Sequence, residues 1–179
     1  MGSSNQISKN TRDTVLELLH QLINQSHVES YFTILDKFRT LDRRSTLDIL
    51  RGLLNHSDSE LRFRAGETLL QLDAEKAQED VMVLLNDPNV DVRSGIAYLL
   101  HEFGDQRAVD ALVNLLLHDP DDDVRSNAAL ALGGIGSEKA VPALKWVILH
   151  DEGSNFQDEP IKNTAEWAIE QIRSAFQTS

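Results

Sequence analysis

Hydrophobic residues recur at helical spacing along most of this chain, in stretches separated by residues that end helices. Across residues 108–116, apolar side chains return every three or four positions, which places them on one face of a helix. A second helical stretch covers about residues 121–135, with Ala and Leu on its inward face. Pro120 between the two stretches and Gly136 after them are residues that end helices. The pattern therefore predicts a pair of antiparallel helices.

This two-helix pattern repeats along the sequence. A Val-Arg pair at positions 92–93 returns at 124–125, and an Asp-Pro pair at 87–88 returns at 119–120, both 32 positions later. A Leu-Arg pair at 61–62 stands at the same place one repeat earlier. Self-similarity at a fixed period of this length is the signature of a helical repeat protein.

A single pair of amphipathic helices cannot bury its apolar face alone, so such pairs must stack. The sequence therefore predicts an all-α fold, an α-solenoid with a right-handed superhelix of about five helical hairpins. The expected domain covers residues 10–176, and residues 1–9 are interpreted as a disordered tail or expression remnant. The predicted repeats are 10–41, 42–73, 74–104, 105–136 and 137–176, of which the first is a divergent cap.

The stretch DPDDDVRSNAALALGGIG, followed by AVPAL, resembles HEAT repeats, specifically the phycobilisome-lyase HEAT-like subfamily. The resemblance covers roughly residues 53–172. In that family the Arg after Val bonds an Asp of the preceding turn, which implies a structural ladder between repeats. Carried over to this chain, the ladder would join Arg62, Arg93 and Arg125 to Asp87, Asp119 or neighbouring carboxylates.

Composition narrows the possible partners. The formal net charge is −12, from 29 acidic and 17 basic residues, so the chain repels phosphate backbones and favours a partner with a basic face. There are no cysteines, which excludes disulfides and thiolate metal sites. Apolar runs fall short of the ~20 residues that span a bilayer, and no secretory signal is evident. We expect a cytoplasmic protein with neither nucleic acid nor membrane as partner.

Three groups of residues contain side chains that could bind a metal. HEAT-type deoxyhypusine hydroxylases bind iron through several His-Glu pairs, whereas this chain has one, at positions 101–102. His118 and His150 stand near predicted helix ends, where a histidine complements the helix dipole. The acidic run 119–123 lacks the Gly and Glu of an EF-hand loop. The sequence therefore predicts no catalytic residue, no metal and no cofactor.

The second helix of each HEAT repeat lines the concave surface of the solenoid, which makes its outward positions the expected partner-binding site. These positions are Phe63, Arg64, Glu67, Tyr98, Glu102, Asn127, Leu130, Thr164 and Trp167. Tyr98, Leu130 and Trp167 share one column and predict an apolar stripe, with Glu67 and Glu102 orienting a basic partner. The alternative is that a shift of the last helix buries Trp167.

Two functions stay open at this point. The first is an adaptor or scaffold, without covalent chemistry, that binds a partner protein or peptide through a basic or helical segment. The second, implied by the resemblance, is a subunit or relative of a bilin lyase acting on phycobiliproteins. A self-assembling array would need apolar end faces, and the acidic C-terminal loop weighs against it. The insertion from Asp151 to Pro160 is either a binding loop or a flexible edge of the groove.

Overall fold

The structure is a computed structural model that describes residues 2–24 and 28–177, with side chains described within 10–24 and 31–175. It divides into two compact units, residues 1–81 and 82–179. Within the described residues, helices dominate, and the only β-type pairing is one isolated bridge between Ser154 and Pro160. The all-α prediction is therefore confirmed. None of the described helices is long and apolar enough to cross a membrane.

The described residues of the first unit form four helices. They are α1 (Gly2–Ile23), α2 (Val28–Thr40), α3 (Arg43–Leu53) and α4 (Ser59–Met82). α1 packs on both α2 and α3, because Leu18, Leu19 and Leu22 face the interior at the spacing of one helix face. α3 begins where the Asp42 side chain accepts a hydrogen bond from the backbone N–H of Ser45, at 2.9 Å.

The first helix begins earlier than the sequence suggested. Residues 2–9, which were assigned to a disordered tail, form the start of α1, and residue 1 lies outside the described residues. After Gly2 the segment contains no glycine or proline, so nothing in its backbone chemistry interrupts the helix before Ile23.

α4 is interrupted at Asp73, whose backbone is extended with φ −162° and ψ 69°. The helical backbone therefore falls into two segments on either side of this residue. Arg43 from α3 bonds the carbonyl of Leu72 at 3.2 Å and the carboxylate of Asp73 at 2.9 Å. These bonds satisfy a carbonyl that the interrupted helix leaves open. The bond from Arg43 also lowers the pKa of the Asp73 carboxyl.

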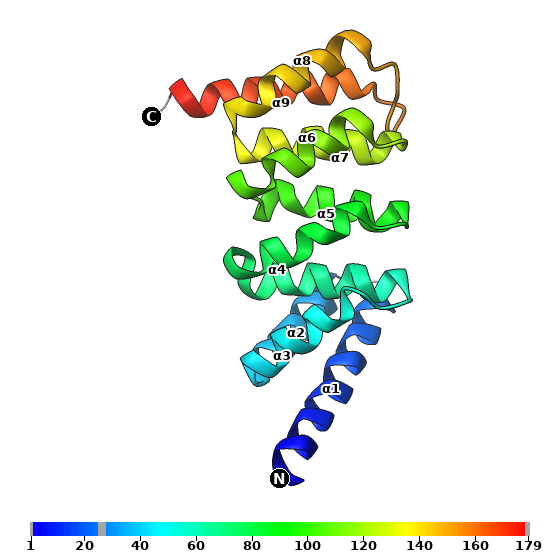
Figure 1. Ribbon diagram of the computed structural model, residues 1–179, viewed down its shortest axis with the longest axis vertical. Coiled ribbons are helices and arrows are strands. Elements are labelled where there is room, and N and C mark those ends of the chain that lie inside the picture. The colour runs from blue at the N-terminus through cyan, green and yellow to red at the C-terminus, as the bar shows by residue number, and fades with distance from the viewer. Residues whose placement is uncertain (1, 25–27, 178–179) are drawn as a thin grey trace. The chain divides into compact units, whose positions relative to one another are not determined.

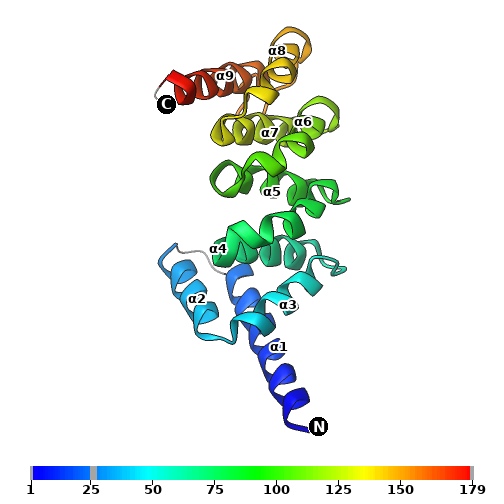
Figure 2. The ribbon, with the colours of Figure 1, turned by 60° about the vertical axis from the view of Figure 1, so that its left-hand side comes forward.

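The second unit is a stack of helical pairs. Its helices are the short 3₁₀ segments η1 (Val83–Asn86), η2 (Gln106–Ala108) and η3 (Glu138–Ala140), and the α-helices α5 (Val90–Phe103), α6 (Val109–His118), α7 (Asp122–Ile135), α8 (Val141–His150) and α9 (Ile161–Gln177). α7 packs between α5 and α9 in one layer, and α6 packs on α8 in the other. Both layers can be followed in Figures 1 and 2.

The core of this stack matches the inward positions expected from the sequence. The buried residues are Ala108, Val109, Leu112, Leu115 and Leu116 around α6, and Val124, Ala128, Ala129, Ala131 and Leu132 in α7. α7 begins at Asp121, whose carboxylate accepts bonds from the N–H groups of Asp123 and Val124. It ends at Gly136, whose φ of 72° is the left-handed conformation that glycine adopts without strain.

Two glycines in the last turn of α7, Gly133 and Gly134, have a packing role. A Cβ on Gly133 would lie 2.8 Å from both the Cα of Ala168 and the ring of Trp167 in α9. A Cβ on Gly134 would lie 2.6 Å from the carbonyl oxygen of His101 in α5. Gly133-Gly134 therefore lets α7 approach its neighbours closely on both sides, and it does not end the helix.

Candidate partner-binding site

Arginine side chains join successive turns of the second unit. The Arg93 guanidinium donates to both carboxylate oxygens of Asp119, at 2.8 and 3.0 Å, and to the carbonyl of Asp87, at 2.9 Å. Only 4% of the Asp119 side chain is exposed. The bond to Asp119 raises the pKa of Arg93, although burial opposes this. The carboxylate partner of Arg93 thus lies in the following repeat. The family resemblance implied an Asp of the preceding turn, and that turn supplies the backbone carbonyl of Asp87 instead.

Arg125 makes the equivalent contacts one repeat later. It donates to Asp151 at 2.8 and 3.2 Å, to Asp122 at 2.6 Å and to the carbonyl of Asp119 at 2.9 Å. The Arg125 side chain is 15% exposed and that of Asp151 is 8% exposed, so both charges are largely removed from water. Removing these charges from water costs free energy, and the bidentate contact offsets that cost because each charge has its partner.

In the first unit, Arg62 is buried and donates to the carbonyls of His56 and Ser57, at 2.8 and 3.1 Å. Its predicted link to a carboxylate of the next repeat joins residues of different units and stays a prediction.

We expect the Asp151 pair to make stability depend on pH in the acidic range. Burial favours the neutral acid, but bonds from Arg125 and from the N–H of Gly153 outweigh it and lower the pKa of Asp151 below its usual 3.8. A carboxyl with a lowered folded-state pKa stabilises the protein above its unfolded-state pKa, and this contribution is lost as the pH falls through the folded value. The wild type should therefore lose its stability advantage over Asp151→Asn below about pH 4.

The measurement is urea unfolding of both proteins between about pH 6 and pH 2.5, the range that brackets the titration of a paired carboxyl. A gap in unfolding free energy that stays constant over this range would show that the Asp151 carboxylate does not contribute as described.

The predicted concave residues of the second unit lie along the layer formed by α5, α7 and α9. Tyr98 is 57% exposed, while Leu130 and Trp167 are partly buried. The Trp167 ring packs over Gly133 and lies 5.9 Å from the ring of His101, centroid to centroid. Trp167 thus contributes to the packing of three helices, and Tyr98 is the member of the column that is most available to a partner.

Polar residues of this layer are partly engaged in joining the helices. Asn127 of α7 donates to the Ser94 hydroxyl of α5 at 2.9 Å. The hydroxyls of Ser126 in α7 and Thr164 in α9 lie 3.3 Å apart, within hydrogen-bonding distance. These contacts hold the three helices in register, which fixes the positions of the side chains between them.

Acidic residues flank the exposed tyrosine. Asp91 and Glu102, one turn or more to either side of Tyr98 on α5, are both exposed. On α7, Asp123 stands one turn before Asn127 on the same helix face. An exposed aromatic ring with exposed carboxylates on the same helix suits a segment that combines cationic and apolar groups.

The remaining predicted positions, Phe63, Arg64 and Glu67, lie on α4 of the first unit. Arg64 bonds Glu60 at 2.9 Å and Glu67 at 3.0 Å, and its guanidinium carbon lies 5.3 Å from the centre of the Phe63 ring. Burial opposes the charge on Arg64, but the bonds to Glu67 and Glu60 raise its pKa. The three residues form a self-contained cluster, which satisfies the cation without a partner.

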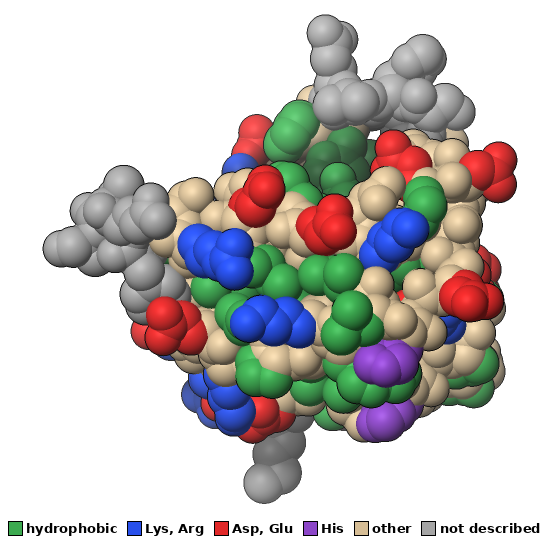
Figure 3. Space-filling model, turned by 90° about the horizontal axis from the view of Figure 1, so that it is seen from above, with side chains coloured by type: hydrophobic (Ala, Val, Ile, Leu, Met, Phe, Trp, Pro, Cys, Tyr) green, Lys and Arg blue, Asp and Glu red, His purple; other side chains and the backbone are tan. Residues whose placement is uncertain are grey.

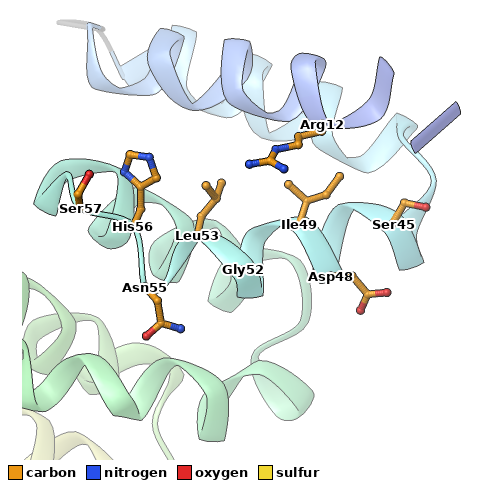
Figure 4. Close-up of a pocket in the computed structure, with 9 residues that line it drawn as sticks. All are labelled: Arg12, Ser45, Asp48, Ile49, Gly52, Leu53, Asn55, His56 and Ser57. Atoms are coloured by element: carbon orange, nitrogen blue, oxygen red, sulfur yellow. The ribbon is translucent and has the colours of Figure 1, made fainter. Parts of the chain in front are cut away.

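The structure also contains hollows outside the predicted binding positions. In the first unit, a cavity of about 680 Å³ lies between α1 and α3 and is lined by Arg12, Ser45, Asp48, Ile49, Gly52, Leu53, Asn55, His56 and Ser57. In Figure 4, Arg12 reaches from α1 toward Ile49 and Leu53, while Asp48 points away from it. In the second unit, an apolar groove of about 650 Å³ lies between α6 and α8.

The sequence contained a signal for this groove. At a shift of 32 positions, Val113 and Asn114 on α6 correspond to Lys145 and Trp146 on α8. The outward face of the first helix therefore gains a cation and a large aromatic ring in the last repeat. Trp146 is 48% exposed in the structure. The expected partner-binding positions lie on the second helices, so they do not include this groove.

Comparison with known proteins identifies the class. Residues 79–170, just over half of the 179-residue chain, match the family model of HEAT repeats. The chain belongs to the HEAT-repeat family. Its structural relatives are repeat solenoids of the armadillo and HEAT kind, and the predicted α-solenoid is therefore confirmed. No curated protein matches the sequence.

Two solved structures illustrate the likeness. The complex of CpcE and CpcF of phycocyanin lyase from Nostoc sp. PCC7120 aligns with a TM-score of 0.61 at 21% identity, over 88% of this chain and 64% of that chain. A designed armadillo repeat protein in complex with the peptide (KR)4 aligns with a TM-score of 0.54 at 18% identity, over 93% of this chain and 89% of that chain. Because the sequence identities are this low, the structural likeness establishes a shared fold and no more.

Proposed function

We propose that this chain is an interaction scaffold that binds a protein or peptide segment along the α5, α7 and α9 layer. The observation that carries the proposal is Tyr98, which is 57% exposed beside the carboxylate of Glu102 on a surface held rigid by the bonds of Asn127 and Thr164. Tyrosine provides a large contact area at low entropic cost, and a rigid surface loses little freedom on binding.

The charge of the chain favours a basic segment as partner. With a net charge of −12, the protein attracts a cationic partner and speeds their encounter. Glu102 provides a carboxylate one turn after the exposed Tyr98 on α5, and Asp91 is exposed at the start of the same helix. The complex of a designed armadillo repeat protein with (KR)4 supports this choice by example, because that related fold holds a peptide of alternating Lys and Arg.

The second candidate is a subunit or relative of a bilin lyase. It is favoured by the fold likeness to the CpcE–CpcF complex, of which this chain spans 64% of the aligned chain. The two functions differ in what they require, because a lyase subunit must act on a bilin pigment. Incubation with a bilin and a phycobiliprotein subunit would reveal lyase activity as a coloured protein adduct.

The scaffold proposal predicts a specific loss of binding in a Tyr98→Ala variant. A fluorescently labelled (KR)4 peptide serves as the probe, and its anisotropy measures binding at low salt. We expect the wild type to bind and Tyr98→Ala to bind roughly tenfold more weakly, the effect of removing one aromatic hot spot. The thermal unfolding midpoint should change little, because the ring is exposed.

The matched control is Phe32→Ala, since Phe32 is 58% exposed on α2 of the first unit and does not belong to the proposed site. This variant should bind the probe like the wild type. Equal weakening by both substitutions, or no binding by the wild type, would contradict the proposed surface.

A further inference from the structure

The loop of residues 151–160 is closed by hydrogen bonds from its own residues. The Asn155 side chain accepts from the N–H groups of Gln157 and Glu159, at 3.0 and 3.1 Å. The Asn155 N–H donates to the carbonyl of Glu159, and its carbonyl accepts from the N–H of Asp158. The single β-bridge of the described structure, between Ser154 and Pro160, closes the base of the loop.

The same loop is fastened to the start of α7. The carboxylate of Asp122 accepts from the N–H of Ser154 at 3.1 Å, and that of Asp123 accepts from the N–H of Phe156 at 2.6 Å. Gly153 lies so close that a Cβ there would approach both Arg125 and Asp122 to within 2.7 Å. The flexible insertion expected as one possibility is instead a shaped loop, so a contact at its tip requires little further ordering.

This shaped loop exposes a phenylalanine. Phe156 is 79% exposed, more than any other large apolar residue in the described part of the chain. Glu152, Asp158 and Glu159 around it are exposed too. An exposed aromatic side chain on a loop whose backbone is fixed by hydrogen bonds, with carboxylates near it in the sequence, complements an apolar pocket that has cations at its rim.

Such a pocket exists on the same chain. The groove between α6 and α8 has a volume of about 650 Å³, within the range of pockets that bind small ligands. Its apolar walls come from Val113, Leu117, Pro142, Ala143 and Trp146. The Trp146 ring stacks on His150, with 4.8 Å between ring centroids and 21° between ring planes, and this contact holds one wall in place. Figure 3 shows hydrophobic side chains lying in bands between separate charged ones.

The charges at this groove have the sign that the loop requires. Lys139 lines the groove, and Lys145 is exposed next to Trp146 on α8. The sequence from Lys139 to His150 contains no acidic residue, although the chain as a whole carries −12. Glu138 precedes this stretch and is exposed, and Asp110 of α6 is paired with Lys139 at 2.6 Å. In a chain of net charge −12, Lys139 and Lys145 together make a local positive contribution at the groove, part of which Asp110 offsets.

We propose that a second copy of this chain inserts Phe156 into the groove between α6 and α8, with the carboxylates of its loop facing the cations at the rim. The two contacting surfaces are different, so the contact is heterologous and adds copies one after another. It does not use the α5, α7 and α9 layer, so it stands independently of the function proposed above. A contact this small predicts weak association, with a dissociation constant on the order of 100 µM.

The test is the mass of the protein in solution at increasing concentration, measured by sedimentation velocity and light scattering. The wild type is expected to gain mass as the concentration rises toward about 1 mM, tenfold above the predicted constant. Phe156→Ser removes the inserted side chain, and Ala143→Glu places bulk and negative charge in the groove. Each variant alone should remain monomeric, with circular dichroism confirming that it is folded.

Mixing the two variants identifies the contact. Phe156→Ser keeps an intact groove and Ala143→Glu keeps an intact loop, so an equal mixture should form dimers and nothing larger. Tyr98→Ala and Phe32→Ser should associate like the wild type. A wild type that stays monomeric at the highest concentration, a mixture without dimers, or normal association of Phe156→Ser would each overturn the proposal.

Discussion

Replacing Arg125 with methionine is expected to lower the free energy of unfolding by about 3–5 kcal/mol, the usual effect of breaking a buried ion pair. The guanidinium bonds Asp151 twice, Asp122 once and the carbonyl of Asp119 once. Removing it leaves the carboxylate of Asp151, which is only 8% exposed, without its cation. Guanidinium chloride unfolding, followed by circular dichroism at neutral pH, measures the change.

Two further variants distinguish the loss of the bidentate contact from the effect of leaving a buried carboxylate unpaired. Arg125→Lys keeps the charge but cannot make the bidentate contact, so an intermediate loss is expected. Arg125→Met combined with Asp151→Asn should recover part of the stability, because the unpaired buried charge is then absent.

Arg39→Met is the matched control, since Arg39 and its partner Asp36 are 56% and 71% exposed and an exposed pair contributes at most about 1 kcal/mol. A loss of similar size at Arg39 and Arg125 would show that the buried pairing is not what stabilises the stack.

Gly133→Ala is expected to destabilise the protein by about 1–3 kcal/mol, as overpacking in a well-filled core does. The added Cβ would lie 2.8 Å from the Cα of Ala168, so backbone of α9 must move, and the ring of Trp167 is equally close. This cost exceeds the gain of up to ~1 kcal/mol that alanine normally brings over glycine within a helix. Thermal and chemical unfolding of the variant measure the net result.

Gly52→Ala is expected to change stability in the opposite direction. Gly52 lies within α3, and a Cβ there would meet no atom within 4 Å. Alanine at this position is therefore expected to stabilise the protein by up to about 1 kcal/mol, because only the helix propensity changes. If both glycine substitutions stabilise, α7 and α9 are not packed as closely as described.

The predictions for Arg125 and Gly133 bear on function because both residues lie in elements that position the candidate surfaces. Arg125 connects α7 to the start of the 151–160 loop through Asp151, and Gly133 sets the distance between α7 and α9. Variants that loosen either contact should weaken binding at the α5, α7 and α9 layer along with stability. Tyr98→Ala, by contrast, should weaken binding alone.

The helical repeat could be predicted from the sequence because its signals are local and recur. The Val-Arg and Asp-Pro pairs at a spacing of 32, the inward Ala and Leu positions and the glycine at 136 each depend on a few neighbouring residues. Their burial in α6 and α7 follows directly from the 3.6-residue period. The start of α1 was less predictable, because short polar residues at a terminus carry no periodic signal.

The candidate site could be predicted only in part. The column of Tyr98, Leu130 and Trp167 is visible in the sequence, but their different exposures depend on neighbours from other repeats. Trp167 extends over a glycine of α7 toward His101 of α5, and the space at Gly133 is created only when these helices meet. Helix periodicity describes one helix at a time, so it cannot contain this information.

The sequence by itself thus determined the fold class, the repeat and its inward faces, because backbone propensity and hydrophobic spacing act over a few residues. Only the tertiary structure decided which carboxylates Arg93 and Arg125 meet, how far Trp167 is buried, and that the 151–160 loop is fastened to α7 with Phe156 exposed. The arginine pairs and the loop contacts join residues about 26 to 33 positions apart, and Trp167 packs against residues of two other helices, so these distances are set by how the helices stack.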